Sequence, residues 1–232
     1  IAPDSMIFDL IMDAFPLDVE EVTRLANVET WHFGELQGPI HVKGTPTDLR
    51  VDAVLNGIFS GYALDDFKLE GAWAPPMFRI DRGEGRFNGA MVSGSGYYTL
   101  DFPERLELDL LAGGLDLSQG FSRGSDLPVT DINGMVHLAY YTATREMRFN
   151  CDLTEGHIRE VPFEKALITG SYSPDDLAFE RIEADSPTHS IRGHGSLDGD
   201  DLRMYFDITA AKADTLFPYL GIDAYRGNVR LT

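Results

Sequence analysis

The segment Leu106-Glu107-Leu108-Asp109-Leu110 alternates large apolar side chains with acidic ones, and similar alternation occurs three times, at steps of 98 residues. Successive side chains of a β-strand point to opposite faces, so the pattern predicts a strand with one apolar and one hydrated face. The other two sets of apolar positions are Phe8, Leu10 and Met12, and Met204, Phe206 and Ile208. We therefore expect equivalent strands to be built at three places in the chain.

Other short segments recur in the same order at nearly the same offset. Gly38-Pro39-Ile40-His41-Val42 returns as Gly134-Met135-Val136-His137-Leu138 and again as Gly227-Asn228-Val229-Arg230-Leu231, at spacings of 96 and 93 residues. Gly94-Ser95-Gly96 returns as Gly193-His194-Gly195, 99 residues on. The shared order and offset indicate an internal repeat.

The repeat predicts the domain organisation. Residues 1–33 are the end of a preceding repeat with a short helix, 34–130 and 131–224 are full repeats, and 225–232 begin a further repeat. We expect the chain to be part of a longer array. Turn signals such as Gly44-Thr45-Pro46 separate the alternating stretches, which predicts seven or eight short strands per repeat.

Helical content is expected to be small. Residues 17–27 carry apolar side chains at helical spacing, with Asp18 as the N-cap, and residues 214–220 look like one or two helical turns. The fold class is therefore all-β, with a few short helices.

Composition excludes several classes of function. The 232 residues include 19 basic and 38 acidic side chains, a net charge of −19. This excess argues against nucleic-acid binding, which requires neutralisation of phosphates, and against docking on an anionic membrane surface. A single cysteine excludes an internal disulfide framework, and no apolar run approaches the ~18 residues of a transmembrane helix.

No constellation of residues supports catalysis or metal binding. The histidines lack metal-ligand spacing, and Asp198-Gly199-Asp200-Asp201 is better interpreted as a hairpin turn than as a calcium site. Cys151 is interpreted as an inert packing thiol. We therefore expect no enzyme, no catalytic residue, no metal and no cofactor. The six histidines are His32, His41, His137, His157, His189 and His194.

The apolar face of such a sheet must be covered. It can close on itself as a sandwich, or it can curl into an open gutter whose interior is filled by acyl chains. Sequence alternation is compatible with both arrangements.

The order of these segments resembles the AsmA-like superfamily, and most of all its TamB branch of large envelope proteins. The resemblance rests on the G-x-[IV]-x-[VL]-x-G opening at 38–44, the Leu-Asp-Asp-Phe-Lys-Leu-Glu-Gly segment at 64–71, the Gly-Ser-Gly segment at 94–96, and the stretches 106–110 and 115–118. It covers nearly the whole chain, because residues 131–232 follow the same order.

The resemblance implies an elongated antiparallel β-groove, a taco-like curved sheet with an apolar lining. Such a segment would conduct phospholipid acyl chains between the inner and outer membranes, in the periplasm of a diderm bacterium. The parent protein would be anchored in the inner membrane, and membrane contact would occur through parts of it outside this chain. The side chains expected to line the groove are Phe8, Leu10, Ile40, Val42, Val51, Ala53, Phe67, Leu69, Phe78, Ile80, Leu106, Leu108, Leu110, Val136, Leu138, Phe149, Cys151, Leu167, Leu177, Phe179, Met204, Phe206 and Ile208.

Two alternatives stay open at this point. The first is a scaffold for outer-membrane protein assembly or secretion, in which the sheet edge holds other strands by augmentation. Its partners would be an outer-membrane barrel protein or other envelope subunits. The second is a closed structural β-repeat.

Overall fold

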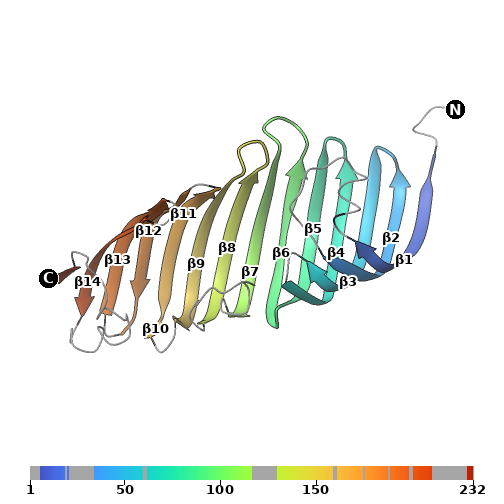
Figure 1. The fold of residues 1–232 in the computed structure, drawn as a ribbon. Coiled ribbons are helices and arrows are strands. Elements are labelled where there is room, and N and C mark those ends of the chain that lie inside the picture. The colour runs from blue at the N-terminus through green and yellow to red at the C-terminus, as the bar shows by residue number, and fades with distance from the viewer. Residues whose placement is uncertain are drawn as a thin grey trace.

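The computed structural model describes residues 6–18, 20, 34–59, 62–116, 130–158, 161–174, 176–187, 189–198, 201–210 and 229–231. These residues form one 15-stranded sheet, in which strands that follow one another in the sequence lie side by side, except that β11 pairs with β9 and not with the short β10 (Figure 1). The sheet is open, elongated and curved, so the predicted all-β fold is confirmed. The strands are β1 (Phe8–Asp18), β2 (Glu35–Thr45), β3 (Asp48–Phe59), β4 (Tyr62–Ala74), β5 (Met77–Phe87), β6 (Ala90–Thr99), β7 (Arg105–Leu115), β8 (Thr130–Tyr141), β9 (Glu146–Ile158), β10 (Val161–Phe163), β11 (Lys165–Ser173), β12 (Asp176–Asp185), β13 (His189–Asp198), β14 (Asp201–Ala210) and β15 (Val229–Leu231).

The two predicted helical stretches lie almost entirely outside the described residues. At the beginning of the first, the backbone N–H of Glu20 donates a hydrogen bond to Oδ1 of Asp18 over 2.9 Å. This is the bond expected of an N-cap aspartate.

Each repeat contributes six strands to the main path of the sheet, β2 to β7 and then β8, β9 and β11 to β14. The short strand β10 pairs only with β9. With β10 counted, the second repeat holds seven described strands, as predicted, whereas the first holds six, one fewer than predicted. The strands are also longer than expected, since β4 and β9 each span 13 residues.

The two margins of the sheet differ in their connections. Short turns at 46–47, 75–76, 100–104 and 142–145 lie along one margin, here called the turn margin. The chain leaves the ends of β1, β7 and β14 at the opposite margin, here called the loop margin, and these strands precede the long connections 19–34, 116–129 and 211–228.

Strand pairing repeats together with the sequence. In β1 to β3, the residues aligned across the sheet are Leu10, Val42 and Val51. In β7 to β9, they are Leu108, Leu138 and Phe149. The segments that recur in the sequence therefore occupy matching places in the sheet.

A β-bulge recurs at the same place in both repeats. In β5 it adds a residue at Asp81 and Arg82, and in β12 it adds one at Glu180 and Arg181. A bulge leaves two residues opposite one and interrupts the alternation of faces. The next residue on the apolar face therefore comes three positions later instead of two, so Gly83 follows Ile80 in β5 and Ile182 follows Phe179 in β12.

The C-terminal strand departs from the repeat in its direction. β2 and β8 pair antiparallel with β1 and β7, but β15 pairs parallel with β14. Val229 lies opposite Phe206, as Val136 lies opposite Leu110. Val229 thus takes the cross-strand place of Val136 while the chain direction is reversed, and this pairing equates Phe206 with Leu110, two residues away from its counterpart at the step of 98 residues.

Candidate functional site

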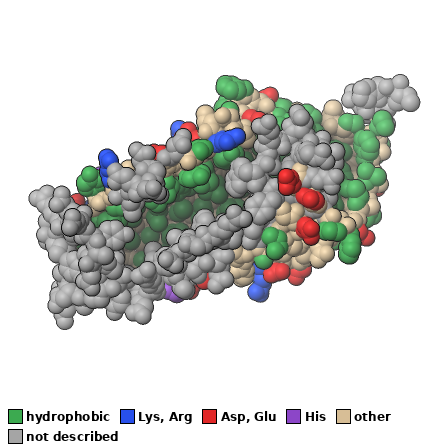
Figure 2. Space-filling model, viewed as in Figure 1, with side chains coloured by type: hydrophobic (Ala, Val, Ile, Leu, Met, Phe, Trp, Pro, Cys, Tyr) green, Lys and Arg blue, Asp and Glu red, His purple; other side chains and the backbone are tan. Residues whose placement is uncertain are grey.

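One face of the sheet is apolar from end to end, and we call this face the trough. Two neighbouring rows of aligned residues show its continuity, because each member is apolar or glycine. The first row is Leu10, Val42, Val51, Gly71, Ile80, Gly96, Leu108, Leu138, Phe149, Gly170, Phe179, Gly195 and Met204. The second row is Met12, Ile40, Ala53, Leu69, Gly83, Gly94, Leu110, Val136, Cys151, Ile168, Ile182, Gly193 and Phe206. Figure 2 shows hydrophobic side chains gathered in a hollow of the sheet.

The structure places every predicted lining side chain on the trough face except Leu167. That residue is aligned with Asp152 and Glu183, which lie on the opposite, outer face. The prediction was wrong because Ala166-Leu167-Ile168 are apolar in succession, so alternation does not say which of them share a face. The pairing with β9 assigns Ile168 to the trough face, since Ile168 is aligned with Cys151.

Large side chains of the trough lie over glycines of the neighbouring strand. A Cβ atom on Gly96 would stand 2.2 Å from the carbonyl oxygen of Glu107 and 2.8 Å from Cδ2 of Leu108, and one on Gly94 would stand 2.2 Å from the carbonyl oxygen of Asp109 and 2.9 Å from Cδ2 of Leu110. The carbonyl oxygens belong to the backbone and cannot move aside as the leucine side chains can, so only glycine leaves enough room. Side chains converge on the concave side of a curved sheet, and glycines opposite large residues let the sheet bend.

Among the described residues, the trough is packed along one side and more exposed along the other. Near the loop margin, Ile132, Leu153, Phe163 and Ala166 form a buried cluster, in which Leu153 is only 4% exposed. Farther from this margin most trough side chains are partly buried, and no large side chain of the described residues is less than 2% exposed. A ligand could therefore reach the apolar surface from the turn margin.

Aromatic residues follow the open side of the trough. Sequence analysis missed most of this row, although extending the alternation two residues beyond Gly71 and Gly96 reaches Trp73 and Tyr98. Rings with polar tips suit a boundary between apolar surface and water. The Tyr98 hydroxyl donates to a carboxylate oxygen of Glu104 at this boundary. The row comprises Trp73, Phe78, Tyr98, Tyr140 and Tyr172, with Leu106, Met147 and Leu177 between them.

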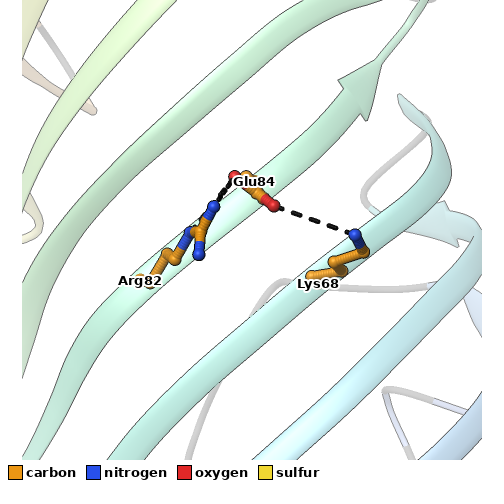
Figure 3. A network of polar contacts seen from close by, with 3 residues as sticks. All are labelled: Lys68, Arg82 and Glu84. Carbon is orange, nitrogen blue, oxygen red and sulfur yellow. Dashed lines mark hydrogen bonds and ion pairs between the residues drawn. The ribbon is translucent and has the colours of Figure 1, made fainter.

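The outer face carries charged side chains whose ion pairs also repeat. Nη2 of Arg82 donates to Oε2 of Glu84 over 2.5 Å, and Nζ of Lys68 lies 3.9 Å from Oε1 of Glu84 (Figure 3). At the matching bulge, Nη2 of Arg181 donates to Oε2 of Glu183 over 2.7 Å, and this bond lowers the pKa of Glu183. Water and salt screen pairs as exposed as these, so they describe a solvated surface and contribute little to stability.

Two repeat-equivalent histidines have similar partners on this face. Nε2 of His41 lies 2.7 Å from Oδ1 of Asp9, and Nδ1 of His137 lies 2.7 Å from Oδ1 of Asp109. Hydrogen bonding from His41 lowers the pKa of Asp9. Within the described ranges, no three His, Cys, Asp or Glu side chains are grouped as a metal site.

Cys151 lies in the trough, aligned with Val136 and Ile168. Burial raises the pKa of its thiol, which keeps the sulfur protonated and weakly nucleophilic. In the part of the chain that the structure describes, no helix is both long and apolar enough to cross a membrane.

No family model, curated protein or solved structure matches this chain. Functional inference therefore rests on the geometry of the trough and on the resemblance of the sequence pattern.

Proposed function

We propose that the trough binds acyl chains of phospholipids and that this chain is a conducting segment of an AsmA/TamB-like envelope protein. The observation that carries the proposal is the unbroken apolar face on a sheet that remains open. All the described strands belong to one sheet, so none forms a second layer over the trough. A closed sandwich would need such a layer.

The trough can shield an acyl chain from water. Each CH₂ group removed from water contributes about 0.8 kcal/mol, so a chain of about 15 such groups gains roughly 12 kcal/mol. Successive strands lie about 4.8 Å apart and present similar apolar rows. An acyl chain that moves along the sheet therefore exchanges one apolar contact for another, without a deep binding site that would hold it.

The cellular setting comes from the resemblance alone. It places the segment in the periplasm of a diderm bacterium, in a parent protein anchored in the inner membrane, with lipid passing between the two membranes. The geometry supports lipid binding, whereas transport between the membranes is inferred from the resemblance alone.

The test is native mass spectrometry of the purified chain, with lipid extraction from the same sample. Leu108 and Leu138 are aligned in the trough, while Leu111 and Met135 are aligned on the outer face of the same two strands. Changing the first pair to Asp should remove co-purifying phospholipid. Changing the second pair to Asp should leave it bound. Far-UV circular dichroism checks that both variants keep their strands.

Trp73 gives a second measurement in which no described residue of the trough is changed. With Trp31 replaced by Phe, Trp73 is the only tryptophan, and it lies in the aromatic row at the open side. Phospholipids brominated on the acyl chain should quench its fluorescence when they bind. Wild-type chain without lipid, together with no quenching by added lipid, would overturn the proposal.

A further inference from the structure

The outer face of the second repeat carries a cleft that crosses the three neighbouring strands β12, β13 and β14. Its volume is about 370 Å³, which falls within the range of about 300–1,000 Å³ seen for small-molecule sites. The side chains that line it alternate along the strands with members of the second trough row, so they project from the face opposite the trough. They are Arg181, Glu183, Arg192, His194, Tyr205 and Asp207.

The first repeat has shorter side chains at two of the positions that build this cleft. Ser95 of β6 is aligned with Asp109 of β7, and the matching pair in β13 and β14 is His194 with Tyr205. Histidine and tyrosine reach farther from the sheet than serine and aspartate, so they form walls that the shorter side chains could not. Because β6 and β7 pair antiparallel in the same way without these rings, the sheet does not need them to form its strands.

The two rings of the cleft stack on each other. The centroids of His194 and Tyr205 are 5.2 Å apart, and their planes differ by 20°. Tyr205 remains 54% exposed, so part of the ring pair is in contact with water. The faces of aromatic rings carry partial negative charge and attract C–H groups, which line the flatter faces of sugar rings. The pair therefore offers a platform for a ring that is polar at its edge and apolar on its face.

The charged groups of the cleft balance one another. Nη2 of Arg181 donates to Oε2 of Glu183 over 2.7 Å. Arg192, which stands where the first repeat has Ser93, is aligned with Asp207, and no described side chain forms an ion pair with either of them. Guanidinium groups only donate hydrogen bonds, whereas carboxylates only accept them. The cleft thus brings strong donors and strong acceptors together around the rings.

This balance selects among classes of ligand. A simple anion at Arg192 would also meet the carboxylates of Glu183 and Asp207, and a simple cation would meet two guanidinium groups. An acyl chain would have to remove these charges from water, which is costly. Hydroxyl groups both donate and accept, so a ligand with several of them suits both kinds of partner.

We propose that this cleft binds a carbohydrate. The rings of His194 and Tyr205 contact the C–H face of a sugar ring, the two arginines donate to its oxygens, and Glu183 and Asp207 accept from its hydroxyl groups. The inference does not depend on what the trough binds, because the cleft and the trough lie on opposite faces of the sheet.

The whole chain is tested first on a glycan array that carries neutral, N-acetylated and uronic-acid oligosaccharides. Saturation-transfer NMR with the oligosaccharide that binds most strongly then gives the dissociation constant. The variant Arg192→Ser with His194→Ser installs the side chains of the first repeat, and we expect it to weaken binding by about tenfold or more, because it removes a charged donor and half of the ring pair. The matched control, Ser93→Ala with Ser95→Ala, changes the corresponding positions of the first repeat and should leave the affinity unchanged.

Tyr205 provides a second comparison. Tyr205→Phe keeps the ring and should retain most of the affinity, whereas Tyr205→Ser should lose it. Far-UV circular dichroism checks that each variant keeps its strands.

Four results would overturn the proposal. They are no binding to any oligosaccharide of the array, full affinity in the double-serine variant, equal loss in the control variant, and binding of inorganic phosphate without binding of any oligosaccharide. The trough variant Leu108→Asp with Leu138→Asp should still bind the oligosaccharide while it loses lipid, so the two proposals can fail separately.

Discussion

Two leucines in strands β7 and β9, which lie on either side of β8, should differ in how much they stabilise the fold. Leu153 belongs to the buried cluster near the loop margin and is 4% exposed, whereas Leu108 lies in the trough and is only partly buried. Changing either one to Ala removes three carbon atoms, which corresponds to about 2.4 kcal/mol of transfer free energy if the site is fully buried.

The difference comes from what surrounds the removed atoms. At Leu153 the change leaves a cavity enclosed by Ile132, Phe163 and Ala166, which adds a further penalty. The unfolding free energy should therefore fall by about 3 kcal/mol, within the range of about 2–5 seen for buried leucines. At Leu108 the space opens onto the trough and no sealed cavity forms, so we expect a loss of about 1.5 kcal/mol.

Equilibrium urea unfolding, followed by far-UV circular dichroism, measures both losses. Leu111→Ala provides the control, because Leu111 is 56% exposed on the outer face and should change stability by less than about 0.5 kcal/mol. Equal losses for Leu108→Ala and Leu153→Ala would mean that the trough is as enclosed as the cluster. That result would refute the open-trough argument.

Three further predictions concern single residues. Gly89→Ala should destabilise the chain by about 1–2 kcal/mol in a thermal melt, because Gly89 has φ +83° although no atom crowds it. A retained melting temperature would contradict this. Burial lowers the pKa of His189 below its usual 6.5, so the unfolded state binds a proton more readily. Stability should fall as pH decreases through about 6.5, and His189→Gln should reduce that slope in pH-dependent urea unfolding. Cys151 should react with a thiol reagent much more slowly in the native chain than in urea, and equal rates would show that its sulfur is accessible.

Much of the fold could be predicted from local pattern. Alternation in 106–110 and its two counterparts predicted strands with one apolar face, and the offset of about 98 residues predicted that equivalent strands recur. Both inferences need only the two-residue period of a strand and the order of residues along the chain. The same reasoning placed nearly all of the lining side chains on one face.

Local pattern failed where a second strand decides the outcome. Leu167 lies among three successive apolar residues, and only its alignment with Asp152 and Glu183 assigns it to the outer face. The bulges at Asp81 and Glu180 shift the alternation inside a strand. No turn signal in the sequence predicts a bulge at these positions.

By itself, the sequence determined that this is an all-β repeat with one apolar face, because side-chain alternation is a property of a single strand. Only the tertiary structure decided that no second layer of described strands covers this face, which has a packed side at Leu153 and an aromatic side at Tyr98. The reason is that curvature depends on contacts between strands, such as Leu108 over Gly96, and these join residues that lie apart in the sequence. Whether an apolar face meets a second layer or a ligand is a property of the assembled sheet.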